Sequence, residues 1–160
     1  MNKSYILQRI IGQLTTDLAV LHTAARTAHE ASIHEENIPD NKYDTLSLEA
    51  SYVAQGQANR AQEIKEALEV YKLLELQRFE EDTPIRLTAL VTLEAEDSSI
   101  RQVFIGPLEG GMKISGQDLE TLVITPGSPL GNGLIGRNVG ETVETGTGAN
   151  RKIFEIIGVS

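Results

Sequence analysis

Four carboxylates lie close together in residues 34–44, HEENIPDNKYD, along with one histidine and one proline. Carboxylate oxygens are preferred ligands of Mg²⁺, and a pair of them can hold such an ion or orient an attacking water. Acidic residues between helices are also commonly a solvated loop, and Asp40 or Asn41 could instead cap a following helix. The segment is longer than the roughly two to five residues that join simple helical hairpins. It is therefore the first candidate for a functional site.

The acidic segment is flanked by two stretches with the apolar spacing of a coiled coil. Before it, seam residues recur every three or four positions, at Leu7, Ile11, Leu14, Leu18, Leu21, Ala25 and Ala28. After it, the same rhythm returns at Ala50, Ala54, Gln57, Ala61, Ile64, Leu68 and Tyr71. Each helix alone would leave an apolar stripe in water, so the pattern predicts an antiparallel coiled-coil hairpin. The small seam residues beside the acidic segment should make that end slim.

Four large apolar residues are predicted to lie off this seam. They are Ile6, Ile10, Val20 and Val70. Because they are surplus to the pairing of the two helices, they leave self-association open, although we expect a monomer.

The pattern changes at QRFEEDTPIRL, where Pro84 follows a polar run. Beyond it the apolar period falls to two or to short runs, as in RLTALVTLEAE, RQVFIGP and KIFEIIGV, and glycines become frequent. The sequence therefore predicts an α+β protein in two parts. Residues 1–80 form the hairpin, with its acidic tip at 34–44, and residues 84–160 form a small β-rich domain with one short helix around LGNGLIG.

Composition limits the kinds of partner that the chain can bind. The formal net charge is −9, from 23 acidic and 14 basic residues, so neutralising phosphates cannot by itself drive binding to free DNA or RNA. A protein partner is the expected anchor. The chain has no cysteine, no apolar run long enough to span a bilayer and no N-terminal signal pattern, so we expect a cytoplasmic protein with no membrane contact. We interpret His22, His29 and His34 as polar surface rather than zinc ligands.

Residues 128–144, SPLGNGLIGRNVGETVE, resemble the C-terminal signature of Gre-type bacterial transcript-cleavage factors. That signature is roughly Ser-Pro-Leu/Ile-x-x-x-Leu-Ile-Gly-x-x-Val-Gly-Asp-x-Val-Glu. The positions in register are Ser128, Pro129, Leu130, Leu134, Ile135, Gly136, Val139, Gly140, Val143 and Glu144. Glu141 replaces the usual Asp. The predicted architecture agrees with the resemblance, because that family has an N-terminal antiparallel coiled coil followed by a small FKBP-like β domain.

The resemblance implies RNA polymerase as the partner. In the family the C-terminal domain docks at the rim of the polymerase secondary channel and the coiled coil passes into the channel. The nascent RNA 3′ end is then met only within the complex. The residues that the resemblance assigns to partner binding are Ser128, Pro129, Leu130 and Gly136.

The resemblance also assigns chemistry to the tip, where the family pattern is close to His-Gly-Asp-Leu-x-Glu-Asn-x-Glu-Tyr. With one inserted residue, Glu36 takes the family's Asp position and Asp40 takes its Glu position. These two are the predicted metal ligands, with Glu35 and Asp44 as alternates and Asn41 and Tyr43 as support. The implied Mg²⁺ is shared with RNA polymerase and not held stably by the free protein. The chain would then stimulate the polymerase's own nuclease activity and would not itself be an enzyme.

Two alternatives stay open at this point. The inserted residue, the exchanged acids and Pro39 at the tip motivate a secondary-channel regulator of initiation or pausing that does not stimulate cleavage. A coiled-coil adaptor unrelated to transcription is the alternative from another class.

Overall fold

A computed structural model describes residues 2–36 and 44–160, and for residues 32, 34–36 and 44–47 it describes the backbone alone. Two long helices come first, α1 (Lys3–Glu36) and α2 (Asp44–Lys72). Six strands and a short helix follow, namely β1 (Leu90–Ala95), β2 (Ile100–Ile105), β3 (Lys113–Ser115), β4 (Glu120–Ile124), α3 (Pro129–Leu134), β5 (Thr142–Thr145) and β6 (Lys152–Val159), with the 3₁₀ turn η2 (Gly148–Asn150) before β6. This confirms the α+β fold class, a helical hairpin followed by a small β-rich domain.

The chain divides into two compact units. The hairpin unit is Ile11–Lys72, and the sheet unit is Met1–Ile10 together with Leu73–Ser160. The first turns of α1 thus belong to the sheet unit. None of the helices in the described ranges is both long and apolar enough to cross a bilayer.

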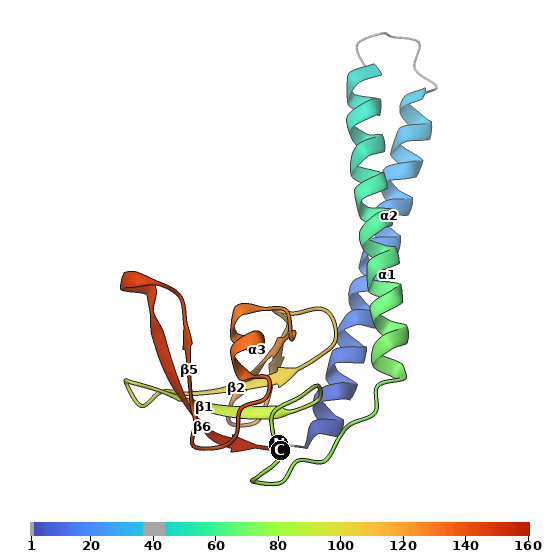
Figure 1. The fold of residues 1–160 in the computed structure, drawn as a ribbon. Helices are drawn as coiled ribbons and strands as arrows, with labels where there is room; N and C mark the ends of the chain where they lie inside the picture. Colours follow the sequence, from blue (N-terminus) through green and yellow to red (C-terminus); the bar gives the residue numbers. More distant parts are fainter. Residues whose placement is uncertain (1, 37–43) are drawn as a thin grey trace. The chain divides into compact units, whose positions relative to one another are not determined.

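Within the hairpin unit, α1 and α2 run antiparallel, side by side (Figure 1). The predicted seam of α2 is confirmed, since every one of its seven positions is at least half-buried and the last four are buried. On α1, Leu14 is fully buried and the later seam positions are half-buried. The heptad spacing therefore placed the contact face of both helices correctly.

The prediction that Ile6 and Ile10 are surplus residues was wrong. Both side chains have 0% exposure, whereas Val20 and Val70 are 62% and 40% exposed as expected. Ile6 and Ile10 precede the seam residue Leu14 at four-residue spacing, so the three side chains lie in one row along an α-helix with 3.6 residues per turn. The buried face at the start of α1 is therefore wider than a two-position seam.

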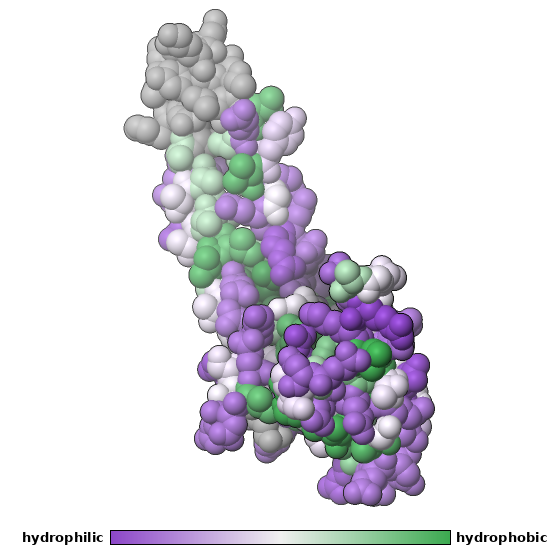
Figure 2. Space-filling view, turned by 90° about the vertical axis from the view of Figure 1, so that its left-hand side faces the viewer, coloured by the Kyte–Doolittle hydropathy of each residue, from purple (hydrophilic) through white to green (hydrophobic). Residues whose placement is uncertain are grey.

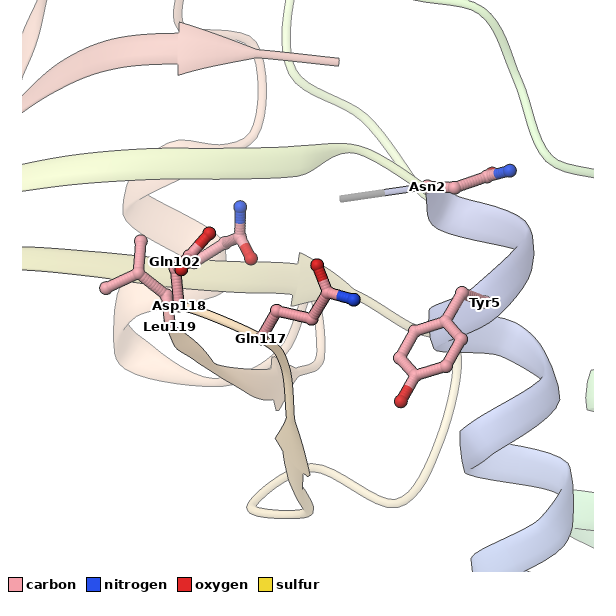
Figure 3. Close-up of a pocket in the computed structure, with 6 residues that line it drawn as sticks. All are labelled: Asn2, Tyr5, Gln102, Gln117, Asp118 and Leu119. Carbon is pink, nitrogen blue, oxygen red and sulfur yellow. The ribbon is translucent and has the colours of Figure 1, made fainter.

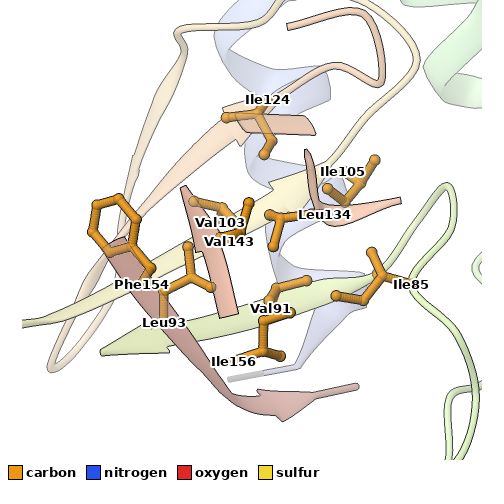
Figure 4. Close-up of a cluster of buried hydrophobic side chains, with 11 residues drawn as sticks. Ile85, Val91, Leu93, Val103, Ile105, Ile124, Leu134, Val143, Phe154 and Ile156 are labelled. Carbon is orange, nitrogen blue, oxygen red and sulfur yellow. The ribbon is translucent and has the colours of Figure 1, made fainter. Parts of the chain in front are cut away.

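The sheet unit contains one six-stranded sheet in the order β3-β4-β2-β1-β6-β5. Strands β2 and β4 pair in parallel, and the other neighbours pair antiparallel. Apolar side chains from one face of the sheet form a core with Leu134 of α3 (Figure 4). The members of this core are Ile85, Ala89, Val91, Leu93, Val103, Ile105, Ile124, Leu134, Val143, Phe154 and Ile156.

Lys3, in the first turn of α1, anchors the segment that leads into β1. Its ammonium donates hydrogen bonds to the carbonyls of Gln77 and Thr88, the latter at 3.2 Å, and lies 4.6 Å from the ring centroid of Phe79. Gln77 N–H in turn donates to the Thr88 hydroxyl at 2.9 Å. Burial lowers the pKa of Lys3, so desolvation opposes part of what these contacts contribute.

Lys3→Met should lower the free energy of unfolding of the sheet unit by about 1 kcal/mol. Methionine keeps the aliphatic stem but loses the two carbonyl hydrogen bonds and the cation–π contact. Hydrogen exchange of the amides of β1 and β2 measures the change. Lys113→Met is the matched control, because Lys113 forms only an exposed pair with Glu120 at 3.5 Å and should change stability by less than about 0.5 kcal/mol. Equal effects of the two variants would show that Lys3 is no anchor.

Candidate functional site

The acidic tip falls between the two long helices. Glu35 and Glu36 are the last residues of α1, and Asp44 is the first residue of α2. Asp40, Asn41 and Tyr43 lie outside the described residues, as do the side chains of Glu35, Glu36 and Asp44. The assignment of Glu36 and Asp40 as metal ligands, with Glu35 and Asp44 as alternates, thus stays a prediction. The two helix ends place the acidic segment at the turn of the hairpin.

Elsewhere in the described part of the chain, no three His, Cys, Asp or Glu residues come together in a way that could hold a metal ion. His22 and His29 are both exposed, in agreement with their interpretation as polar surface.

The hairpin next to the tip is built from small side chains. Ala28, Ala50 and Ala54 are half-buried where the two helices face one another. Together with His29, Ser51 and Gln55 they line a cavity of about 240 Å³. Small side chains let helices approach closely, but they also leave empty space that longer side chains would fill. The end of the hairpin therefore carries little side-chain bulk in its seam.

In the sheet unit, Ser128 starts α3 as its N-cap. Its hydroxyl accepts a hydrogen bond from Gly131 N–H at 3.1 Å and donates one to the Thr125 carbonyl at 2.7 Å. Pro129 follows at the first helical position, where its missing N–H costs nothing. Ser128 is thus a structural residue in the free protein, whatever it contacts in a complex.

Close packing requires a glycine at position 131, and the backbone conformation favours one at position 136. A Cβ on Gly131 would lie 1.9 Å from the Thr125 carbonyl oxygen. Gly136 has φ of +84°, in the left-handed region that favours glycine, and its N–H donates to the Ile85 carbonyl at 2.8 Å. The Ile85 N–H donates to the Arg137 carbonyl at 2.8 Å, so two hydrogen bonds fasten this turn to the chain before β1.

The four predicted partner-binding residues differ in how far their side chains are exposed. Pro129 and Gly136 are exposed, whereas Leu130 is half-buried against the core and Ser128 is half-buried in the cap. Hydrophilic side chains cover most of the sheet unit on the face seen in Figure 2, and apolar side chains form small groups among them. An exposed Pro129 and Gly136 on a rigid turn are suited to contact a partner.

A long helical hairpin joined to a small mixed sheet, with one short helix capped by a Ser-Pro pair, defines the class of this protein. Residues 83–160 match the family model described as transcription elongation factor, GreA/GreB, C-term. This part of the chain therefore belongs to the GreA/GreB family of transcription elongation factors. This sets aside the adaptor unrelated to transcription. A search of curated proteins found no match to the chain.

Several solved structures are similar to this chain over most of its length. The transcription factor Gfh1 is 19% identical, with 94% of this chain and 93% of that chain covered and a TM-score of 0.41. The GreA factor homolog 1 (Gfh1) of Thermus thermophilus is 20% identical, with 94% of each chain covered and a TM-score of 0.39. A GreA/GreB elongation factor from Nitrosomonas europaea is 14% identical, with 83% and 91% covered and a TM-score of 0.38. The family assignment rests on the match over residues 83–160 and not on these structures.

Proposed function

We propose that this protein binds RNA polymerase at its secondary channel and stimulates cleavage of the transcript in backtracked complexes. The observation that carries the proposal is an acidic segment at the turn of a long, slender hairpin that is joined to a GreA/GreB C-terminal domain. In this proposal the protein is not itself an enzyme. It adds groups to the polymerase active site, and it meets the 3′ end of nascent RNA only within the complex.

The chemistry at the tip follows from the ligands that Mg²⁺ prefers. A hard cation that keeps several waters needs only one or two carboxylates in addition to phosphate oxygens. A second such ion in the polymerase site activates water and balances charge on the leaving oxygen. Glu36 and Asp40 would hold it jointly with the polymerase, and Asn41 and Tyr43 would support them. The free protein supplies too few ligands to bind the ion stably.

The sheet unit supplies the docking surface at the channel rim in this proposal. Pro129 and Gly136 are exposed on a turn that the Ser128 cap and the Ile85 hydrogen bonds hold in place. A net charge of −9 makes independent binding to nucleic acid unfavourable, so protein contacts must provide the anchor. We infer a cytoplasmic monomer with no membrane contact.

A second candidate function is a secondary-channel regulator of initiation or pausing without cleavage activity. The sequence at the tip favours it, because the two acids are exchanged in kind, one residue is inserted and Pro39 lies between them. Proline fixes φ and so narrows the conformations through which Asp40 could reach an ion.

A backtracked elongation complex with end-labelled transcript, incubated with Mg²⁺ with and without the protein, tests the proposal. We expect shortened transcripts that appear faster with the protein present, and retention of polymerase on the immobilised protein. Retention without shortened transcripts would support the non-cleaving regulator instead. Failure to retain polymerase would contradict both functions.

A further inference from the structure

A pocket of about 400 Å³ opens on the sheet unit, away from the Ser128 turn in sequence. It is lined by Asn2, Tyr5, Gln102, Gln117, Asp118 and Leu119. All six residues belong to the sheet unit, because α1 contributes only its first turns. In Figure 3 the side chains of Gln117 and Tyr5 point toward one another, while the amide of Asn2 points away. The cavity falls within the range of about 300–1,000 Å³ typical of ligand sites, so it can admit one long side chain.

Two hydrogen bonds fix the frame of the pocket. The Oδ1 atom of Asn2 accepts from Ser4 N–H at 2.9 Å, which caps α1 and sets the turn that carries Tyr5. On β2, the Oε1 atom of Gln102 accepts from the hydroxyl of Thr121 at 2.7 Å, and Thr121 is fully buried. The parallel pairing of β2 with β4 places Gln102 and Thr121 opposite each other. The pocket is thus formed before a ligand arrives.

The charge of the pocket favours a cationic ligand. Asp118 is the charged residue of its lining, and none of the six is basic. The nearby Lys113 and Glu120 form an ion pair at 3.5 Å, so they offset each other. The ammonium of Lys3 is held by the carbonyls of Gln77 and Thr88. A phosphate would meet a carboxylate here without a compensating cation. The Oδ1 atom of Asn2 and the Oε1 atom of Gln102 already accept hydrogen bonds, so Asp118 and Gln117 alone offer too few ligands for a metal ion with no phosphate beside it.

The remaining chemistry fits a guanidinium better than an ammonium. Tyr5, which is 44% exposed, presents an aromatic ring on which a planar cation can stack. Gln117 and Asp118 both carry acceptor oxygens, and a guanidinium carries five donors in a fixed plane. Leu119 provides an apolar contact for the methylene stem of a long side chain.

We propose that this pocket binds the side chain of an arginine from a basic segment of a partner protein. The chain's net charge of −9 would steer such a segment toward it. The proposal does not depend on RNA polymerase being that partner.

The test is an NMR titration of the full chain with the blocked tripeptide acetyl-Gly-Arg-Gly-amide. We expect saturable shifts of the Gln102 and Gln117 side-chain amides and of the Tyr5 ring, with a Kd in the millimolar range that one side chain supports. The same peptide with citrulline, which is neutral and nearly isosteric, should bind at least about fivefold more weakly. Adenosine serves as a probe for a planar neutral ligand.

Variants then locate the site. Asp118→Asn should weaken binding of the arginine peptide about fivefold, and Tyr5→Leu should weaken its binding about threefold. Glu155→Gln removes one exposed carboxylate elsewhere on the same sheet and should leave the Kd unchanged. The proposal is overturned if the citrulline peptide binds as well as arginine, if only adenosine shifts these resonances, or if the arginine peptide gives no saturable shift.

Discussion

Glu36→Ala combined with Asp40→Ala should slow transcript cleavage in a backtracked complex by about a hundredfold or more, and should leave polymerase binding unchanged. Metal-ion stabilisation of transition-state charge is worth several kcal/mol, and each 1.4 kcal/mol is tenfold in rate. Binding should persist because the proposed docking residues Pro129 and Gly136 belong to the sheet unit, and the two acids do not. Single-turnover cleavage rates and retention of polymerase on immobilised protein measure the two effects.

Loss of negative charge alone could slow the approach of the hairpin to a metal ion, so a charge-matched control is needed. Glu30→Ala with Glu69→Ala removes two exposed carboxylates, one from each helix, and leaves the tip intact. This control should cleave at close to the wild-type rate. If it slows cleavage as much as the tip variant does, the tip acids act through charge and not through position. Single Glu35→Ala and Asp44→Ala variants then show whether the alternates can substitute.

Much of the fold was predictable because its signals are local. The heptad spacing identified the contact face of α2 at all seven positions, from Ala50 to Tyr71. The short apolar runs predicted β1, β2 and β6, and the LGNGLIG stretch predicted α3. Each of these elements is set by the periodicity of its own residues, so a single sequence carries the information.

Features that depend on distant residues were not predictable in the same way. Ile6 and Ile10 were predicted to be surplus because they fall outside the seam spacing. Both are buried, and the first turns of α1 belong to a unit formed with Leu73–Ser160. The parallel pairing of β2 with β4 is likewise non-local. The residues of the proposed arginine pocket come from the start of α1 and the residue before it, from β2 and from the segment before β4, and no spacing in the sequence relates them. The acidic tip was visible in the sequence because its residues are contiguous, but its geometry was not.

Position 131 is left open by the signature around Ser128, and the structure supplies a physical reason for the glycine found there. Gly131→Ala should lower the free energy of unfolding of the sheet unit by about 3 kcal/mol, because its Cβ would lie 1.9 Å from the Thr125 carbonyl oxygen. That carbonyl cannot move freely, since it accepts hydrogen bonds from both the N–H and the hydroxyl of Ser128. Hydrogen exchange of the amides of β2 and β4 reports the change for this unit by itself.

Gly127→Ala is the matched control, because a Cβ there would meet nothing within 4 Å. It should change stability by less than about 0.5 kcal/mol. Since Pro129 and Gly136 flank Gly131 on the proposed docking turn, Gly131→Ala should also weaken retention of polymerase, whereas the tip variant should not. This separates the two proposed tasks of the chain, docking by the sheet unit and chemistry by the tip. Equal stability of the two glycine variants would contradict the close approach of α3 to Thr125 on which that docking turn depends.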